Sequence, residues 1–103
     1  MVNKGKHTHQ KEYWLVCYDI NDDRRRSRIA SLLEAHGRRV NYSVFELLLS
    51  LDNMTRLKRV LLARLRPETD RLHFYPLCLK DFCKAERHGL PYGSEETETI
   101  CSV

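Results

Sequence analysis

Apolar and polar residues along the chain first predict a strand followed by a helix. Residues 13–20 (YWLVCYDI) form a nearly continuous apolar run rich in aromatic and β-branched side chains, which is typical of a strand buried on both faces. The polar cluster at residues 21–23 (NDD) suits a helix N-cap, and apolar positions recur at helical spacing over residues 24–36. Gly37 is then expected to end this helix as its C-cap.

The next segment, residues 38–51, changes the phase of its alternation. Its apolar side chains alternate in one phase as far as residue 44 and in the opposite phase from residue 45 onward. Because the side-chain period of a strand is two, this change requires a bulge or a break. Two short strands, or one sharply bulged strand, are therefore expected. Asp52 or Asn53 is expected to cap a second helix, which ends at Pro67.

The remaining segments complete the order of elements. Residues 72–79 predict a last core strand, in which Pro76 indicates an edge position or a bulge. The order β-α-β-β-α-β is that of an α+β, ferredoxin-like sandwich with two helices on one face of an antiparallel sheet. This fold hosts many unrelated functions. We expect a polar N-terminal arm over residues 1–12, the domain itself over residues 13–90 and a weakly strand-like C-terminal tail over residues 91–103.

Composition adds a preference for a polyanionic partner. The chain has 103 residues, enough for one compact domain. Its last ten residues carry three glutamates and no basic residue, whereas the other 93 hold 18 basic and 11 acidic residues. Twelve of the basic residues are arginines, whose planar guanidinium groups suit phosphate, so RNA or DNA is the favoured partner. No apolar run approaches the ~20 residues of a membrane span, and a soluble, cytoplasmic protein is expected.

Asp19 is the strongest candidate for chemistry. It stands at the end of the most apolar predicted strand, where a rigid element holds its carboxylate at the rim of the sheet. Two interpretations are open: a turn-forming or helix-capping residue, or a hard oxygen ligand for Mg²⁺ or Mn²⁺. A two-fold homodimer would place two copies of Asp19 across its axis and supply a pair of carboxylates.

Arginines cluster directly after Asp19 and recur farther along the chain. Positive charge at a helix N-terminus is unfavourable with respect to the helix macrodipole, so four arginines there indicate either a solvated helix face or a phosphate-binding role. The candidate nucleic-acid ligands are Arg24, Arg25, Arg26 and Arg28 in this helix, Arg38 and Arg39 at the start of the next strand, and Arg56 and Arg59 on the second helix.

Several short segments resemble the CRISPR-associated protein 2 family. They are residues 18–23 (YDINDD), the helix arginines Arg26 and Arg28, residues 39–45 (RVNYSVF) and residues 74–78 (FYPLC), in the order and spacing of that family. The resemblance implies a ferredoxin-like homodimer in which the C-terminal strand of each protomer joins the sheet of its partner. It also implies a place in the spacer-acquisition (adaptation) module, beside the CRISPR integrase (CRISPR-associated protein 1).

The resemblance further implies a Mg²⁺-dependent endonuclease acting on RNA or DNA. Carried over by motif, Asp19 is the metal ligand, and the positions linked to nuclease activity are Tyr18, Arg26, Arg28, Arg39 and Phe45. Two hypotheses remain open. In the first, paired Asp19 carboxylates hold a metal ion that assists phosphodiester hydrolysis. In the second, the protein is a non-catalytic, DNA-binding dimeric scaffold of the integrase complex. A third, a small-molecule regulatory domain, is opposed by the excess of arginine.

Overall fold

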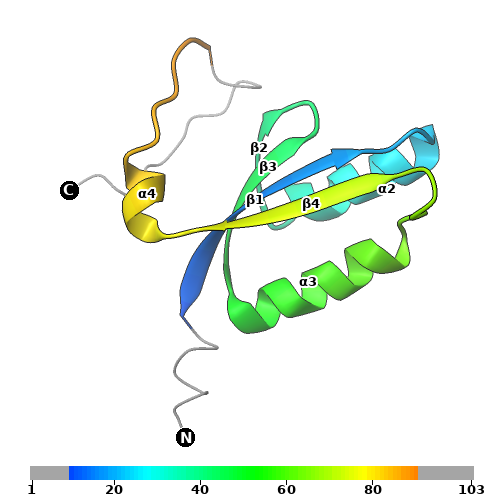
Figure 1. Cartoon of the computed structure of the whole chain (residues 1–103), viewed down its shortest axis with the longest axis horizontal. Helices are drawn as coiled ribbons and strands as arrows, with labels where there is room; N and C mark the ends of the chain where they lie inside the picture. Colours follow the sequence, from blue (N-terminus) through cyan, green and yellow to red (C-terminus); the bar gives the residue numbers. More distant parts are fainter. Residues whose placement is uncertain (1–9, 91–103) are drawn as a thin grey trace, which may run out of the picture.

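The computed structural model describes residues 10–90 of the chain (Figure 1). This part folds into four strands and three helices. Their order along the chain is β1 (Lys11–Asp19), α2 (Asp23–Glu34), β2 (Gly37–Asn41), β3 (Val44–Ser50), α3 (Leu51–Ala63), β4 (Arg71–Leu77) and the short α4 (Leu79–Cys83).

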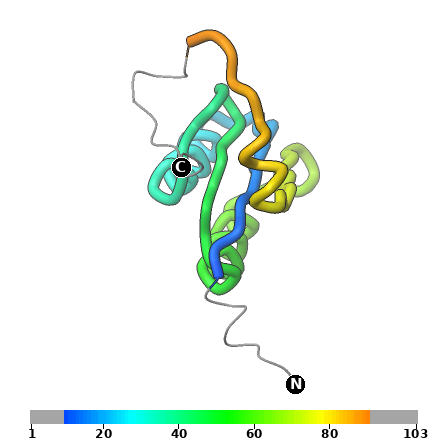
Figure 2. The backbone as a smooth tube through the Cα atoms, turned by 90° about the vertical axis from the view of Figure 1, so that its left-hand side faces the viewer, coloured from blue at the N-terminus to red at the C-terminus, as the bar shows by residue number. Residues whose placement is uncertain are grey.

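The four strands form one antiparallel sheet in the order β2-β3-β1-β4, with β1 and β3 in the middle. Helices α2 and α3 pack on one face of this sheet, and α4 lies on the other side, next to β1 (Figures 1 and 2). The predicted order β-α-β-β-α-β and the α+β, ferredoxin-like architecture are confirmed.

The hydrophobic core lies between the sheet and the two long helices. Along β1, every second side chain from Trp14 through Val16 to Tyr18 is buried on the helix side. The helices contribute Ile29, Ala30 and Leu33 from α2 and Met54, Leu57 and Leu61 from α3. This packing fixes the position of the end of β1, where Asp19 stands.

The opposite face of the sheet is covered at one end only. There Tyr13 stacks on Phe82 of α4, with ring centroids 3.8 Å apart. Farther along β1 on this face, Leu15 and Cys17 are only half-buried. The prediction that β1 is buried on both faces is therefore correct for its start and wrong for its middle, because no helix of the described chain covers that part.

Helix α2 begins as predicted and ends differently. Asp22 is its N-cap, and the carboxylate accepts a hydrogen bond of 2.8 Å from the backbone N–H three residues later. The C-cap is Ala35, and Gly37 is the first residue of β2, so its prediction as a helix cap is wrong. Glycine is needed there for space, since a β-carbon would lie closer than 3.0 Å to the Leu47 side chain and the Glu46 carbonyl oxygen.

The phase change in the second apolar segment is resolved by two strands, as predicted, with the turn at residues 42–43. The cap of α3 differs from the prediction. Ser50 is the N-cap, and its hydroxyl accepts a hydrogen bond of 3.2 Å from the backbone N–H of Asn53, whereas Asp52 lies inside the first turn. The helix ends at Ala63, before the proline that was expected to end it.

β4 is an edge strand, as Pro76 indicated. The strand ends at Leu77, and Leu79 already begins α4, so the core strand is shorter than predicted. Because β4 pairs only with β1 among the described strands, its outer edge is open within this part of the chain.

The predicted domain boundaries, at residues 12 and 90, stay predictions. β1 begins at Lys11, so the last residues of the arm expected over 1–12 belong to the sheet. The strand predicted within residues 91–103 lies outside the described residues. Among residues 10–90, no helix combines the length and the apolar character needed to cross a membrane.

Candidate active site

A groove with a volume of about 710 Å³ opens where β1 ends. One wall is a face of α2 and the opposite wall is the end of β2 with the turn to β3. Its lining includes Tyr18, Asp19, Arg26, Glu34, Arg39 and Tyr42. We call it the α2 groove. It brings together four of the residues predicted for the site, which come from three different elements.

Asp19 is exposed and is the last residue of β1. Within the described part of the chain, its carboxylate forms no hydrogen bond or ion pair. The neighbouring carboxylates are all engaged: Asp22 caps α2, and Asp23 forms an ion pair with Arg26. Asp22, and not Asp19, therefore caps α2, and the Asp19 carboxylate at the end of β1 is left without a partner within residues 10–90.

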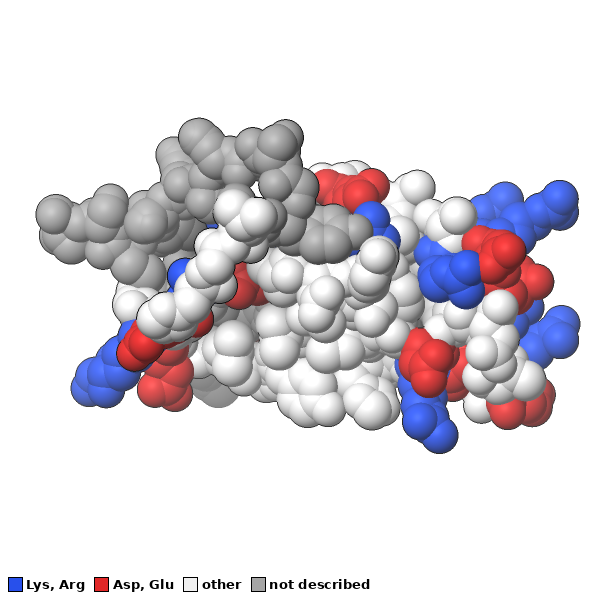
Figure 3. Space-filling view, turned by 90° about the horizontal axis from the view of Figure 1, so that it is seen from above, with Lys and Arg blue, Asp and Glu red and all other residues white. Residues whose placement is uncertain are grey.

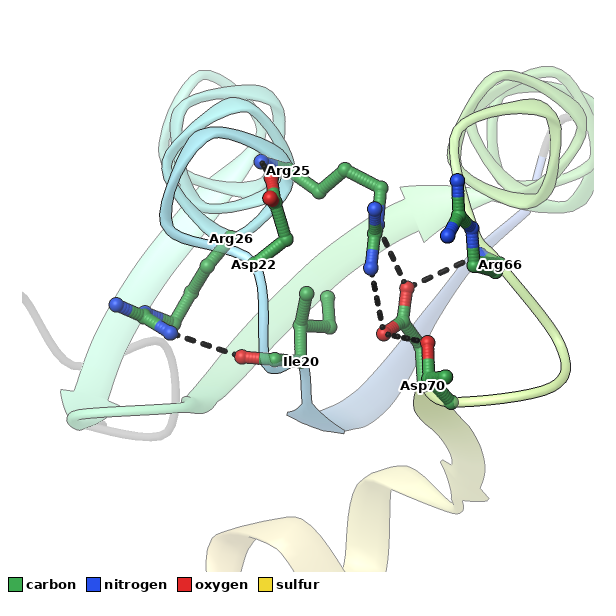
Figure 4. A network of polar contacts seen from close by, with 7 residues as sticks. Ile20, Asp22, Arg25, Arg26, Arg66 and Asp70 are labelled. Carbon is green, nitrogen blue, oxygen red and sulfur yellow. Dashed lines mark hydrogen bonds and ion pairs between the residues drawn. The ribbon is translucent and has the colours of Figure 1, made fainter.

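Arg26 stands on α2 at the rim of the groove, with its side chain 43% exposed. Its guanidinium donates a hydrogen bond of 2.8 Å to the carbonyl oxygen of Ile20 (Figure 4). The same guanidinium also pairs with Asp23. A guanidinium carries five N–H donors, so these two contacts leave donors for an incoming phosphate oxygen.

Arg39 is the centre of a network that reaches β1, α2 and the β2–β3 turn. Its guanidinium donates to the Tyr42 carbonyl oxygen at 3.1 Å, to the Glu34 carboxylate at 3.2 Å and to the Tyr18 hydroxyl at 3.3 Å. The same group lies 5.1 Å from the centre of the Phe45 ring, which is fully buried and stacks with Tyr18. Phe45 therefore supports Arg39 and Tyr18 from below, and its ring is closed to a substrate.

Arg25 points away from the groove and binds Asp70, between the two helices (Figure 4). The contact is bidentate, at 2.9 and 3.1 Å, and the Asp70 side chain is fully shielded. Asp70 also accepts hydrogen bonds from the backbone N–H of Arg66 and the hydroxyl of Thr69. Arg25, followed by these two donors, lowers the pKa of Asp70 to about 2. Arg25 thus fastens the start of α2 to the loop between α3 and β4.

The other predicted arginines are spread over the surface. Arg38 binds Glu46 at 2.9 Å across the β2–β3 pair, and Arg56 donates to Asn53 at 3.1 Å on α3. Arg56 is exposed, as are Arg24 and Arg28 on α2 and Arg59 on α3. Figure 3 shows basic and acidic side chains mixed at the right-hand end of the molecule, where in Figure 1 α2 begins and α3 ends. Arg28 does not join the groove lining.

Glu34 and Tyr42 are among the groove residues that the sequence analysis did not propose for the site. Glu34 lies eight residues after Arg26 and on the same face of α2, so helical periodicity alone could have placed both in one groove. Tyr42 lies inside a segment that already stood out, but its place in a turn beside the groove depends on how β2 and β3 pair.

The described residues of one chain do not form a complete metal site. No group of three or more His, Cys, Asp or Glu side chains within residues 10–90 is placed to hold a metal ion. Asp19 and Glu34 are the carboxylates among the residues that line the groove, and Glu34 is paired with Arg39, so Asp19 is the one whose hard oxygen has no ion-pair partner within residues 10–90. Mg²⁺ takes one or two protein carboxylates and completes its shell with waters and phosphate oxygens, so a second Asp19 would suit it.

The family model described as CRISPR associated protein Cas2 matches residues 12–85. The chain belongs to the Cas2 family. It is 46% identical over 77 residues to a Rhodospirillum rubrum protein named CRISPR-associated endoribonuclease Cas2 4, a match that covers 75% of this chain and 60% of that relative. The chain thus spans less than two thirds of that protein.

Two solved structures share the fold. Streptococcus pyogenes Cas2 superposes with a TM-score of 0.67 at 29% identity, over 75% of this chain and 99% of that one. A chain of a partial Cas6-RT-Cas1–Cas2 complex superposes with a TM-score of 0.63 at 26% identity, over 86% of this chain and 98% of that one. The family assignment and the ferredoxin-like fold therefore rest on sequence and structure alike.

Proposed function

We propose that this Cas2 protein is a Mg²⁺- or Mn²⁺-dependent endonuclease that hydrolyses phosphodiester bonds of RNA or DNA in the CRISPR adaptation module. The observation that carries the proposal is the Asp19 carboxylate, which is exposed and unpaired within the described chain, although two arginines line the same groove. The endoribonuclease name of the Rhodospirillum rubrum relative supports the same chemistry.

A homodimer completes the site in this proposal. The uncovered part of the sheet face opposite α2 and α3 carries apolar side chains that are half-buried or exposed. They are Leu15, Cys17, Val44, Leu48 and Tyr75. Asp19 follows Leu15 and Cys17 in the alternation of β1 and so belongs to the same face. A second copy packed there would bury the apolar surface and bring two Asp19 carboxylates to a common axis.

The chain's own residues would divide the work of catalysis. Asp19 from each protomer would hold the metal ion, which supplies Lewis-acid stabilisation of charge on the phosphate. Arg26, whose free N–H donors face solvent at the rim, would bind a phosphate oxygen and offset the charge of the transition state. Arg39 would act as a positioning residue, because its contacts already hold Tyr18 and the β2–β3 turn.

The decisive experiment compares wild-type protein with Asp19→Asn on labelled RNA and DNA, with and without Mg²⁺. We expect the rate of metal-dependent cleavage to fall by more than roughly 100-fold. Loss of a residue that only hydrogen-bonds to a metal ligand already lowers metal affinity or activity by about 10- to 100-fold, and loss of the ligand itself should cost more. Asp52→Asn is the matched control, because this exposed carboxylate lies outside the groove on α3. Cleavage by Asp19→Asn at the wild-type rate would assign the activity to another site or to a contaminant.

The second candidate function is a DNA-binding scaffold that works with the Cas1 integrase. It is favoured by the likeness to the Cas1–Cas2 complex and by the exposed arginines Arg24, Arg28 and Arg59 on the two helices. This function predicts that Asp19→Asn keeps both duplex binding and complex formation with Cas1. Loss of both, in a variant that still folds and dimerises, would contradict the scaffold hypothesis.

A further inference from the structure

Arg71 lies directly opposite Asp19 in the pairing of β4 with β1. It is the first residue of β4, and the sequence analysis did not propose it for the site. Residues directly opposite each other in an antiparallel pair project to the same face of the sheet, with β-carbons about 4.5–5.5 Å apart. Leu72, the next residue of β4, packs on the core on the helix side, so Arg71 projects, like Asp19, to the other face.

The guanidinium of Arg71 has no partner among residues 10–90. The side chain is exposed, and within this part of the chain it forms no hydrogen bond, ion pair or ring contact. Arg25 and Arg26, at the start of α2, are in contrast each paired with an aspartate. Although Asp19 lies opposite, its carboxylate forms no ion pair with Arg71. Arg71 therefore keeps its five N–H donors for a ligand at this end of the sheet.

The backbone that carries Arg71 is fixed by the buried carboxylate of the preceding residue, Asp70. This carboxylate accepts two hydrogen bonds from Arg25, at 2.9 and 3.1 Å, and one of 3.0 Å from the backbone N–H of Arg66 (Figure 4). These contacts tie the start of β4 to α2 and to the segment after α3. β4 thus begins at a fixed place beside Asp19, and only the side chain of Arg71 has to move to reach a ligand.

Arg71 and the α2 groove lie on opposite sides of Asp19. The groove is lined by residues of β1, α2, β2 and the segments next to them, whereas β4 flanks β1 on its other side. Neighbouring strands are about 4.8 Å apart, so Arg71 is one strand spacing from Asp19. A phosphodiester backbone that crossed the end of β1 would therefore meet Arg26 on one side of Asp19 and Arg71 on the other.

We propose that Arg71 is a further phosphate-binding residue of the site, which holds the nucleic-acid backbone on the side of Asp19 away from the α2 groove. The proposal rests on the proposed phosphodiester chemistry at Asp19. A phosphate brought to that carboxylate is repelled by it, and a cation beside both groups lowers the repulsion. The planar guanidinium of Arg71 can also bind two phosphate oxygens at once. Because the contact is to the backbone, it carries no sequence preference.

The test measures binding by the full-length protein in buffer without divalent cations, so that metal-dependent cleavage does not interfere. The probes are a short labelled single-stranded RNA and a labelled DNA duplex. We expect Arg71→Gln to raise the Kd by about 10-fold at low salt, as loss of one charged hydrogen bond does. The slope of log K against log salt should fall by about 0.7 for the single strand or 0.9 for the duplex. Arg71→Lys keeps the charge and should keep the slope.

Two controls separate a phosphate contact from other effects of the charge. Lys80→Gln is the matched control, because this exposed cation lies on α4, beyond the other end of β4, and its Kd and slope should equal those of the wild type. Arg71→Gln is also made in the Asp19→Asn background. A residue that binds phosphate loses the same affinity there, whereas one that only neutralises Asp19 no longer has an effect. Because Arg71 is exposed, the thermal midpoint of Arg71→Gln should not change.

Two outcomes would overturn the proposal. One is a Kd of Arg71→Gln within about twofold of the wild-type value for both probes, with an unchanged salt slope. The other is a loss of affinity that disappears in the Asp19→Asn background. A loss confined to one probe would support the proposal and identify RNA or duplex DNA as the ligand. Failure of the proposed nuclease function is read separately, from the cleavage assay of Asp19→Asn with Mg²⁺, since this binding is measured without metal.

Discussion

Gly37 offers a direct test of how β2 is placed, because the structure and the sequence give different reasons for a glycine there. In the structure, a β-carbon at this position would lie closer than 3.0 Å to Leu47 and to the carbonyl oxygen of Glu46, where ordinary contact is 3.4–4 Å. Leu47 is 1% exposed and cannot swing into solvent. The carbonyl belongs to β3, so relief requires the two strands to move apart. We expect Gly37→Ala to lower the free energy of unfolding by about 1–3 kcal/mol, the usual cost of overpacking.

Urea denaturation followed by circular dichroism measures this change, and Gly37→Asn separates the two explanations. Asparagine tolerates the left-handed backbone of a helix C-cap, so Gly37→Asn would be more stable than Gly37→Ala if Gly37 were a helix cap. If space is the constraint, the larger asparagine should be at least as damaging as alanine. Gly89→Asn is the matched control, because Gly89 has a φ of +92° and no atom of the described residues lies within 4 Å of an added β-carbon. The close-approach argument would be refuted if the free energy of unfolding of Gly37→Ala were within about 0.5 kcal/mol of the wild-type value and that of Gly37→Asn were higher than that of Gly37→Ala.

Two further predictions concern ion pairs and surface charge. The pKa of Asp70 is held at about 2, below its ordinary value near 3.9, so the ionised group contributes stability above about pH 4 that is lost as the pH falls through 2. Between pH 4 and 2 the melting temperature of the wild type should therefore fall more steeply than that of Asp70→Asn. Parallel pH profiles of the two melting temperatures would contradict this prediction. Arg59→Glu on the exposed face of α3 should weaken duplex DNA binding and reduce the slope of log K against log salt by about 0.9 for each lost phosphate contact; an unchanged slope would remove Arg59 from the interface.

The fold was predictable because periodicity is a property of each segment, whereas element ends depend on contacts between segments. The alternation of β1 and the phase change before β3 were enough for the order of elements. Gly37 was misassigned because its reason lies across the sheet in β3. α4 was missed since a helix of five residues has little intrinsic stability, and the stack of Phe82 on Tyr13 holds it in place.

The candidate site was predictable in its residues and not in their roles. The end of a strand exposes a carboxylate such as Asp19 wherever the sheet stops, so its availability could be argued from sequence. Arg25 and Asp70, in contrast, are 45 residues apart and meet only when α2 and α3 pack side by side. Likewise, nothing local indicates that Arg39 uses its guanidinium on Tyr18 and the turn. The sequence indicates that such arginines are candidate phosphate ligands. Only the contacts in the folded chain show that some of them stabilise the fold.

The ion pairs of the groove arginines also explain why the Asp19 carboxylate has no partner among them within the described chain. An exposed carboxylate in a groove with arginines would ordinarily be expected to pair with one of them. Here each groove arginine is held by a carboxylate of α2: Arg26 by Asp23 and Arg39 by Glu34. Both pairs are local in the sequence, since Asp23 and Arg26 are one helical turn apart on α2 and Glu34 and Arg39 are five residues apart. The negative charge of Asp19 is thus left without an ion-pair partner within the described chain. In the proposed homodimer, two such charges at the axis would repel each other until a cation or a proton lay between them.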